Sequence, residues 1–133
     1  MTEKTTGPTV VSPRALFVDD EEMNRKLLTL QLAPSGFEVV ACASGDDALV
    51  RVGEQAFDLA ILDVMMPGMD GIELCRRLRA RGHKFPVLFM SGWPDQETRE
   101  RARMAGGDAF LPRPYRREQL IAAIDELMGR DRH

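Results

Sequence analysis

Four short apolar runs along the chain each stop at a polar side chain. The runs cover residues 15–18, 59–62, 87–90 and 109–112, and the polar residues that follow them are Asp19, Asp63, Ser91 and Arg113. Uninterrupted apolar runs of this length are typical of strands buried on both faces, as in parallel sheets covered by helices. Ligands of such sheets bind outside the carboxyl ends of the strands. The pattern therefore predicts that these polar side chains share one site.

The segments between the apolar runs have the periodicity and end signals of helices. We expect strands over 14–19, 37–41, 57–62, 85–90 and 108–111, and helices over 21–32, 44–55, 70–79 and 117–128. A further, polar helix is expected after Pro94-Asp95 and ends at Gly106-Gly107. In the first helix Met23, Leu27 and Leu30 lie on one face. The alternation of strands and helices indicates an α/β fold, a doubly wound parallel sheet of five strands.

Composition narrows the class of protein. The 133 residues are enough for one domain, and the net charge of 18 − 21 = −3 does not indicate a nucleic-acid partner. No apolar run is long enough to span a membrane, and residues 1–13 do not resemble a signal peptide, so we expect a cytoplasmic protein. Cys42 and Cys75 are expected to be buried thiols. We expect a disordered lead over 1–13, one folded domain over 14–129 and a short tail over 130–133.

Three of the expected site residues are carboxylates, namely Asp19, Asp20 and Asp63. Two unit charges about 4 Å apart repel by roughly 4 kcal/mol at an effective dielectric of about 20, so the cluster needs a cation. Oxygen ligands with room for water suit Mg²⁺, which would also accept phosphate oxygens. One carboxylate is then a candidate nucleophile toward a phosphoryl group, whose remaining oxygens the hydroxyl of Ser91 and the cation of Arg113 could hold.

The motifs at these positions resemble those of receiver domains of two-component response regulators, in the single-domain form of the chemotaxis regulators. They are Phe17-Val18-Asp19-Asp20, the stretch from Ile61 to Gly71, Met90-Ser91-Gly92, and the stretch from Gly106 to Pro114. The resemblance extends over residues 14–129, which would form the receiver domain. It implies a flavodoxin-like (βα)5 fold with strand order 2-1-3-4-5.

The resemblance also implies a role for each acid. Asp63 matches the phosphoacceptor, which takes a phosphoryl group from a sensor histidine kinase or a histidine phosphotransfer protein. Asp20, Asp63 and the backbone carbonyl of Met65 match direct Mg²⁺ ligands. Asp19 matches the acid of the metal site that usually acts through a metal-bound water.

The remaining motif residues match the switch and the phosphate-binding positions. Ser91 and Phe110 match the switch hydroxyl and the switch aromatic, and Gly92 matches a small residue that leaves the site open. Arg113 departs from the family pattern, which has lysine, and the next residue, Pro114, matches a proline whose peptide bond is usually cis. Because arginine is a wide planar fork, it could bind the phosphoryl group bidentately or reach a neighbouring acid. We expect phosphorylation to be retained and its coupling to the switch to be altered.

Two apolar side chains flank the expected site, Met65 after Asp63 and Trp93 after Ser91. The corresponding positions of receivers influence how fast water attacks the acyl phosphate. Since both are apolar here, we expect slow self-dephosphorylation.

Other functions have to be weighed against a phosphoacceptor. Arg113 is the one feature that favours a degenerate receiver acting as a phosphorylation-independent binding module. A phosphatase with an aspartyl-phosphate intermediate would need D-x-D after the first strand, and an FMN binder would need a Ser/Thr/Gly-rich loop there; the chain has Asp19-Asp20-Glu21-Glu22. Only five residues follow Met128, so we expect output through a partner protein or another histidine; a fragment of a hybrid histidine kinase is the alternative.

Overall fold

The computed structural model describes residues 12–93 and 95–129. The elements are β1 (Arg14–Val18), α1 (Glu22–Leu32), the short 3-10 helix η1 (Ala33–Ser35), β2 (Glu38–Cys42), α2 (Gly45–Glu54), β3 (Leu59–Asp63), α3 (Gly71–Ala80), β4 (Val87–Ser91), α4 (Gln96–Met104), β5 (Ala109–Pro112) and α5 (Arg117–Met128). Of the expected disordered lead and tail, residues 1–11 and 130–133 lie outside the described residues.

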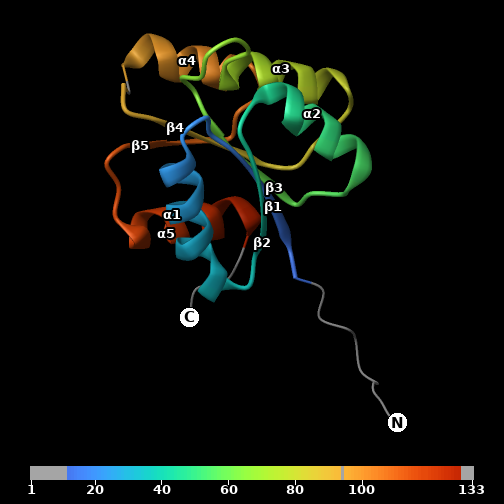
Figure 1. The fold of residues 1–133 in the computed structure, drawn as a ribbon. Coiled ribbons are helices and arrows are strands. Elements are labelled where there is room, and N and C mark those ends of the chain that lie inside the picture. Colours follow the sequence, from blue (N-terminus) through green and yellow to red (C-terminus); the bar gives the residue numbers. More distant parts are fainter. Residues whose placement is uncertain (1–11, 94, 130–133) are drawn as a thin grey trace.

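The five strands form one parallel sheet in the order β2-β1-β3-β4-β5. This confirms the predicted fold class and strand order. Helices α1 and α5 cover one face of the sheet, and α2, α3 and α4 cover the other (Figure 1). Because β1 and β3 are neighbours, and β3 and β4 are neighbours, the residues that end these strands lie side by side at one edge.

The three central strands β1, β3 and β4 are buried on both faces, as their apolar runs predicted. The same prediction is wrong for β5, where only Leu111 is buried, because β5 is an edge strand of the sheet. Every residue of β3 and β4 is buried. Alternate side chains of β3 enter different cores: Leu59 and Ile61 pack toward α1 and α5, whereas Ala60 and Leu62 pack toward α2, α3 and α4. Side chains of parallel strands point to opposite faces in turn, so one apolar run supplies both cores.

The predicted apolar face of the first helix is not the face that packs on the sheet. Met23, Leu27 and Leu30 are 74%, 52% and 71% exposed, whereas Leu28 and Leu32 are buried. Both sets have helical spacing, and only the second set meets the core. Helix α1 therefore carries an exposed apolar row in addition to its buried one.

The loop between β3 and α3 is held at both ends, which positions it above the carboxyl edge of the sheet. Asp70 caps α3 as predicted, because its Oδ1 accepts a hydrogen bond from the Glu73 amide at 2.8 Å. The Gly71 amide donates to the Val64 carbonyl at 3.1 Å.

Among the helices of the described residues, none is both long and apolar enough to cross a membrane.

Candidate functional site

Three carboxylates meet at the carboxyl edge of the sheet. Asp63 ends β3, while Asp19 and Asp20 follow the neighbouring strand β1. One oxygen from each carboxylate lies within 4.8 Å of the others. Asp19 and Asp63 are buried, and Asp20 is exposed. The structure thus brings together the three acids that the sequence placed at strand ends.

Arg113, which follows β5, reaches across the sheet edge to two of these acids. Its Nη2 donates to Asp19 Oδ2 at 2.7 Å, and its Nη1 lies 3.4 Å from Asp63 Oδ1. The Arg113 side chain is 22% exposed, whereas those of Asp19 and Asp63 are 0% and 8% exposed. The guanidinium is therefore a partly buried counter-ion, and the peptide bond from Arg113 to Pro114 is cis, as expected.

Asp19 has a hydrogen-bond partner on each carboxylate oxygen. Oδ1 accepts from the Glu21 amide at 2.9 Å, and Oδ2 accepts from Arg113. The Asp19 carbonyl accepts from Arg25 Nη1 at 2.7 Å. These contacts orient a fully buried carboxylate, whose burial would be costly without partners. The role of Arg25 is not visible in the sequence, because no motif marks a side chain that binds a backbone carbonyl.

Asp63 is the acid with the altered proton affinity. Burial raises the pKa of Asp63 to about 6; Arg113 acts in the opposite direction, and the charge of Asp19 adds to the rise. The Met65 amide donates to Asp63 Oδ1 at 3.2 Å and favours the ionised form. The Met65 side chain itself is exposed.

Ser91 ends β4, the strand next to β3, and is fully buried. Its hydroxyl oxygen accepts a hydrogen bond from the Trp93 amide at 2.9 Å, which leaves its proton available for another acceptor. Its carbonyl accepts from the Arg113 amide at 2.8 Å. At Gly92 a Cβ atom would meet nothing within 4 Å, so the space beside this residue is open.

Phe110 lies in β5, away from the acids, and is half-buried against the core beneath α2, α3 and α4. The guanidinium carbon of Arg99 lies 4.7 Å from the centroid of its ring, within the range of a cation–π contact. This contact connects α4 to β5. The sequence placed Phe110 in a motif but gave no signal for Arg99.

Gly71 ends the motif that begins at Ile61, and the structure gives this glycine a role. A Cβ atom on Gly71 would lie 2.1 Å from the carbonyl oxygen of Asp63. Only glycine permits this close approach of the two backbones. Gly71 therefore fixes how the β3–α3 loop passes over the carboxylate cluster.

The donor set fits a hard divalent cation. All three side chains offer oxygen, and Asp20 and Asp63 each retain an oxygen without a hydrogen bond to the described residues. Mg²⁺ favours a few carboxylates together with waters, and the exposure of Asp20 leaves room for water. The thiols of Cys42 and Cys75, which softer metals would prefer, lie buried in the core.

The family model described as "Response regulator receiver domain" matches residues 15–125. The chain belongs to the response regulator receiver domain family. Members of this family are signalling domains, and the acid cluster lies within the matched residues of this receiver.

Curated relatives share more than a third of the receiver's residues. The phosphate regulon transcriptional regulatory protein PhoB of Rhizobium meliloti is 37% identical over 120 residues, which cover 89% of this chain and 53% of PhoB. The response regulator MprA of Mycobacterium leprae is 38% identical over 117 residues, 88% of this chain and 51% of MprA. The chain therefore spans about half the length of these relatives.

Two solved structures match the receiver over nearly their full length. The chemotaxis protein CheY4 of Vibrio cholerae has a TM-score of 0.84 at 28% identity, and the match covers 88% of this chain and 99% of that chain. The receiver domain of the Francisella response regulator 1452 has a TM-score of 0.82 at 26% identity, covering 88% and 97%. The likeness to chemotaxis regulators expected from the sequence is confirmed.

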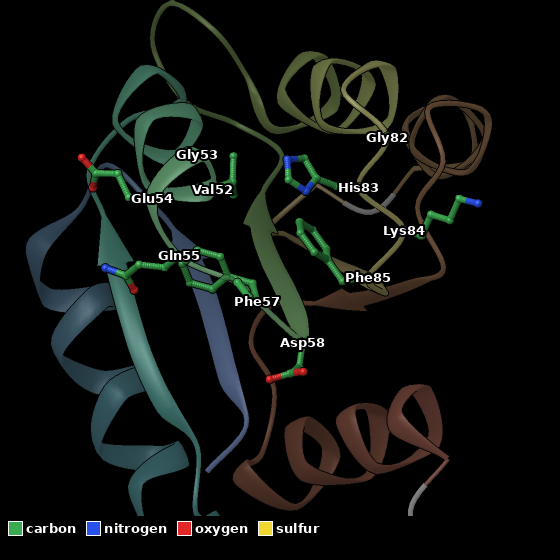
Figure 2. Close-up of a pocket in the computed structure, with 11 residues that line it drawn as sticks. Val52, Gly53, Glu54, Gln55, Phe57, Asp58, Gly82, His83, Lys84 and Phe85 are labelled. Carbon is green, nitrogen blue, oxygen red and sulfur yellow. The ribbon is translucent and has the colours of Figure 1, made fainter. Parts of the chain in front are cut away.

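A hollow of about 700 Å³ lies at the opposite edge of the sheet from the carboxylate cluster. Figure 2 shows it between the segment 52–58 before β3 and the segment 82–85 before β4. The rings of His83 and Phe85 stack at 5.4 Å there. Charges of both signs surround it, with Glu54 and Asp58 on one side and Lys84 on the other. It is separate from the carboxylate cluster, because it lies at the amino ends of β3 and β4.

Proposed function

We propose that this receiver is a Mg²⁺-dependent phosphoacceptor in a two-component pathway and that Asp63 carries the phosphoryl group. The single observation that carries the proposal is the meeting of Asp19, Asp20 and Asp63, with oxygens within 4.8 Å, at a strand edge that Arg113 also reaches. Three acids and one cation in this arrangement suit the transfer of an anionic group onto a carboxylate.

Asp20, Asp63 and the backbone carbonyl of Met65 are the residues that would hold Mg²⁺, with Asp19 acting through a metal-bound water. When bound, the cation would supply charge neutralisation for the incoming phosphoryl oxygens. One carboxylate oxygen of Asp63 provides the nucleophile, and the other would hold the cation. As the bond from the attacking oxygen to phosphorus forms, the bond from phosphorus to the donor histidine nitrogen breaks, and its electron pair stays on that nitrogen.

Ser91 and Arg113 hold the remaining phosphoryl oxygens in this proposal. The Ser91 hydroxyl has a proton to donate, since its oxygen serves as acceptor for the Trp93 amide. Arg113 presents several N–H groups from a planar fork, a geometry that suits phosphate. The open space beside Gly92 admits the group. Phe110 then acts as the switch aromatic on the neighbouring strand.

The phosphodonor in this proposal is a sensor histidine kinase or a histidine phosphotransfer protein, and the output is a downstream protein target. The net charge of −3 supports a protein partner rather than nucleic acid or a membrane surface, because acidic residues elsewhere balance the arginine-rich segments 76–81 and 99–103. A cytoplasmic location follows from the same proposal. Enzymatic action is confined to the domain's own phosphorylation and dephosphorylation.

Intact-mass analysis tests the proposal. The protein is incubated with acetyl phosphate and MgCl₂, in parallel with Asp63→Asn and with a sample containing a chelator. We expect the mass of one phosphoryl group on wild type only, and only with MgCl₂. Asp58→Asn, which alters an acid at the opposite edge of the sheet, is the matched control and should still be phosphorylated. Labelling of Asp63→Asn would contradict Asp63 as the acceptor.

The same experiment distinguishes the phosphoacceptor from the main alternative. A degenerate receiver that works as a binding module would gain no phosphoryl mass under any of these conditions. Arg113 is the residue that favours this alternative, because it differs from the family's lysine. The intact set of acids and the buried Ser91 favour the phosphoacceptor.

A further inference from the structure

Arg113 already occupies the acid cluster from within the protein. Its Nη2 is 2.7 Å from Asp19 Oδ2 and its Nη1 is 3.4 Å from Asp63 Oδ1, so one guanidinium spans acids that come from two strands. Nη2 also contacts Met90 Sδ, at 3.8 Å. The planar fork makes such a two-pronged contact possible.

The two contacts of Arg113 differ in strength. The contact with Asp19 is short and the Asp19 carboxylate is fully buried, so Nη2 of Arg113 is strongly held there. The Asp63 contact is longer, and Asp63 Oδ1 also accepts from the Met65 amide. The contact between Nη1 and Asp63 is therefore the one that can be broken at the lower cost in free energy.

We propose that Arg113 is a tethered counter-ion that competes with the divalent cation for Asp63 while it stays anchored on Asp19. This inference rests on the proposed function, since it concerns the same metal site. When no cation is bound, the guanidinium of Arg113 partly neutralises the negative charge of Asp19 and Asp63. When a cation binds, like-charge repulsion weakens the contact of Nη1 with Asp63, and Nη1 becomes available to a phosphoryl oxygen on that residue.

The competition has a measurable consequence for cation affinity. Removing Arg113 removes a positive charge in direct contact with the ligands, so Arg113→Gln should bind Mg²⁺ more tightly than wild type, by about tenfold or more. Arg25→Gln is the matched control. Arg25 also lies beside Asp19, but among the described residues it donates to the backbone carbonyl and not to a carboxylate of the cluster. Its removal should change Mg²⁺ affinity by less than about threefold, because screening weakens charges that are not in contact.

Titration calorimetry with MgCl₂ at mildly alkaline pH measures the three affinities, and thermal unfolding with and without MgCl₂ measures the linked stability. For Arg113→Gln we expect a lower melting temperature without MgCl₂ and a larger rise on adding it than for wild type. Equal affinities in wild type and Arg113→Gln would overturn the competition. So would an equal gain in Arg113→Gln and Arg25→Gln, which would indicate a long-range effect of charge.

Two further outcomes are distinguished by design. Absence of Mg²⁺ binding in all three proteins would remove the metal from the proposed function itself, whereas equal binding would refute only the competition. If Arg113→Gln does not fold, nitrogen-detected spectra of the arginine side chains of wild type decide the question. We expect MgCl₂ to move the guanidinium signals of Arg113 and to leave those of Arg25 in place; unchanged Arg113 signals at saturation would refute the proposal.

Discussion

At the scale of single residues, the sequence predicted that the acids and Arg113 share one site, but it did not decide which partner Arg113 binds. Asp19 and Asp63 end apolar runs, and the geometry of a parallel sheet places such ends together. Arg113 also ends a run, but a long side chain can go to several partners. The burial and charge of Asp19 decide where the Arg113 side chain binds, and this burial exists only in the packed structure. Arg25, which lies six residues after Asp19, had no signal in the sequence.

The two cysteines give a prediction about reactivity. Burial raises the pKa of Cys42 to about 12 and that of Cys75 to about 11, and the Cys75 thiol donates to the Ala105 carbonyl at 3.3 Å. Because the thiolate is the reactive form, neither cysteine should react with a disulfide reagent in the folded protein. Both should react once guanidinium chloride unfolds it. Rapid reaction of one thiol under native conditions would contradict the burial of that residue.

Met65 and Trp93 bear on the lifetime of the proposed phosphoryl group. Their side chains are 67% and 71% exposed, beside the ends of β3 and β4. As apolar groups they offer no hydrogen bond that would orient an attacking water. We expect the phosphorylated protein to lose its label slowly, over minutes or longer after acetyl phosphate is removed, and Met65→Gln to lose it faster. A lifetime of seconds for wild type would contradict this expectation.

At the scale of elements, the types and order of the helices and strands followed from sequence, but the packing face of α1 did not. Two apolar rows with helical spacing run along α1, and periodicity alone cannot decide which one meets the sheet. Leu28 and Leu32 pack against the core, while Met23, Leu27 and Leu30 face outward. Which row faces the sheet is decided by how α1 packs against the strands, and this packing is a property of the tertiary structure.

The connection from β3 to α3 gives an element-scale prediction. In Gly71→Ala the new methyl group would lie 2.1 Å from the Asp63 carbonyl oxygen, so the backbone must move. We expect a loss of roughly 2–3 kcal/mol in the free energy of unfolding, together with weaker Mg²⁺ binding, because Asp63 shifts. Urea unfolding and titration with MgCl₂ measure the two effects.

Gly53→Ala is the matched control for that change. Gly53 lies within α2, and a Cβ atom there would meet nothing within 4 Å. Alanine favours a helix over glycine by about 1 kcal/mol, so this variant should be slightly more stable than wild type. It should bind Mg²⁺ like wild type. An equal loss of stability in both variants would show that the close approach at Asp63 is not what requires Gly71.

At the scale of the whole molecule, one side chain connects segments that the sheet leaves separate. Arg79, near the end of α3, donates to the carbonyls of Gly106, His83 and Phe85 at 2.7–3.1 Å and to Asp108 Oδ2 at 3.0 Å. Asp108 Oδ2 in turn accepts from the Val87 amide at 2.9 Å. Arg79 therefore ties α3 to the loops before β4 and β5, and the loop before β4 lines the hollow of Figure 2. Sequence could not identify it, because most of its acceptors are backbone carbonyls.

Replacement of Arg79 should thus weaken the fold without altering the functional site. Arg79→Ala leaves several partly buried acceptors without a donor, and we expect a loss of roughly 2–4 kcal/mol in the free energy of unfolding. Arg77→Ala is matched in helix and in substitution, but Arg77 is 53% exposed and pairs with Glu73 alone among the described residues, so its loss should be below about 1 kcal/mol. Since Arg79 lies at the opposite edge of the sheet from Asp63, both folded variants should bind Mg²⁺ with wild-type affinity. Weaker binding in folded Arg79→Ala would mean that the two edges of the sheet are coupled, which the separate contact networks of Arg79 and Arg113 do not predict.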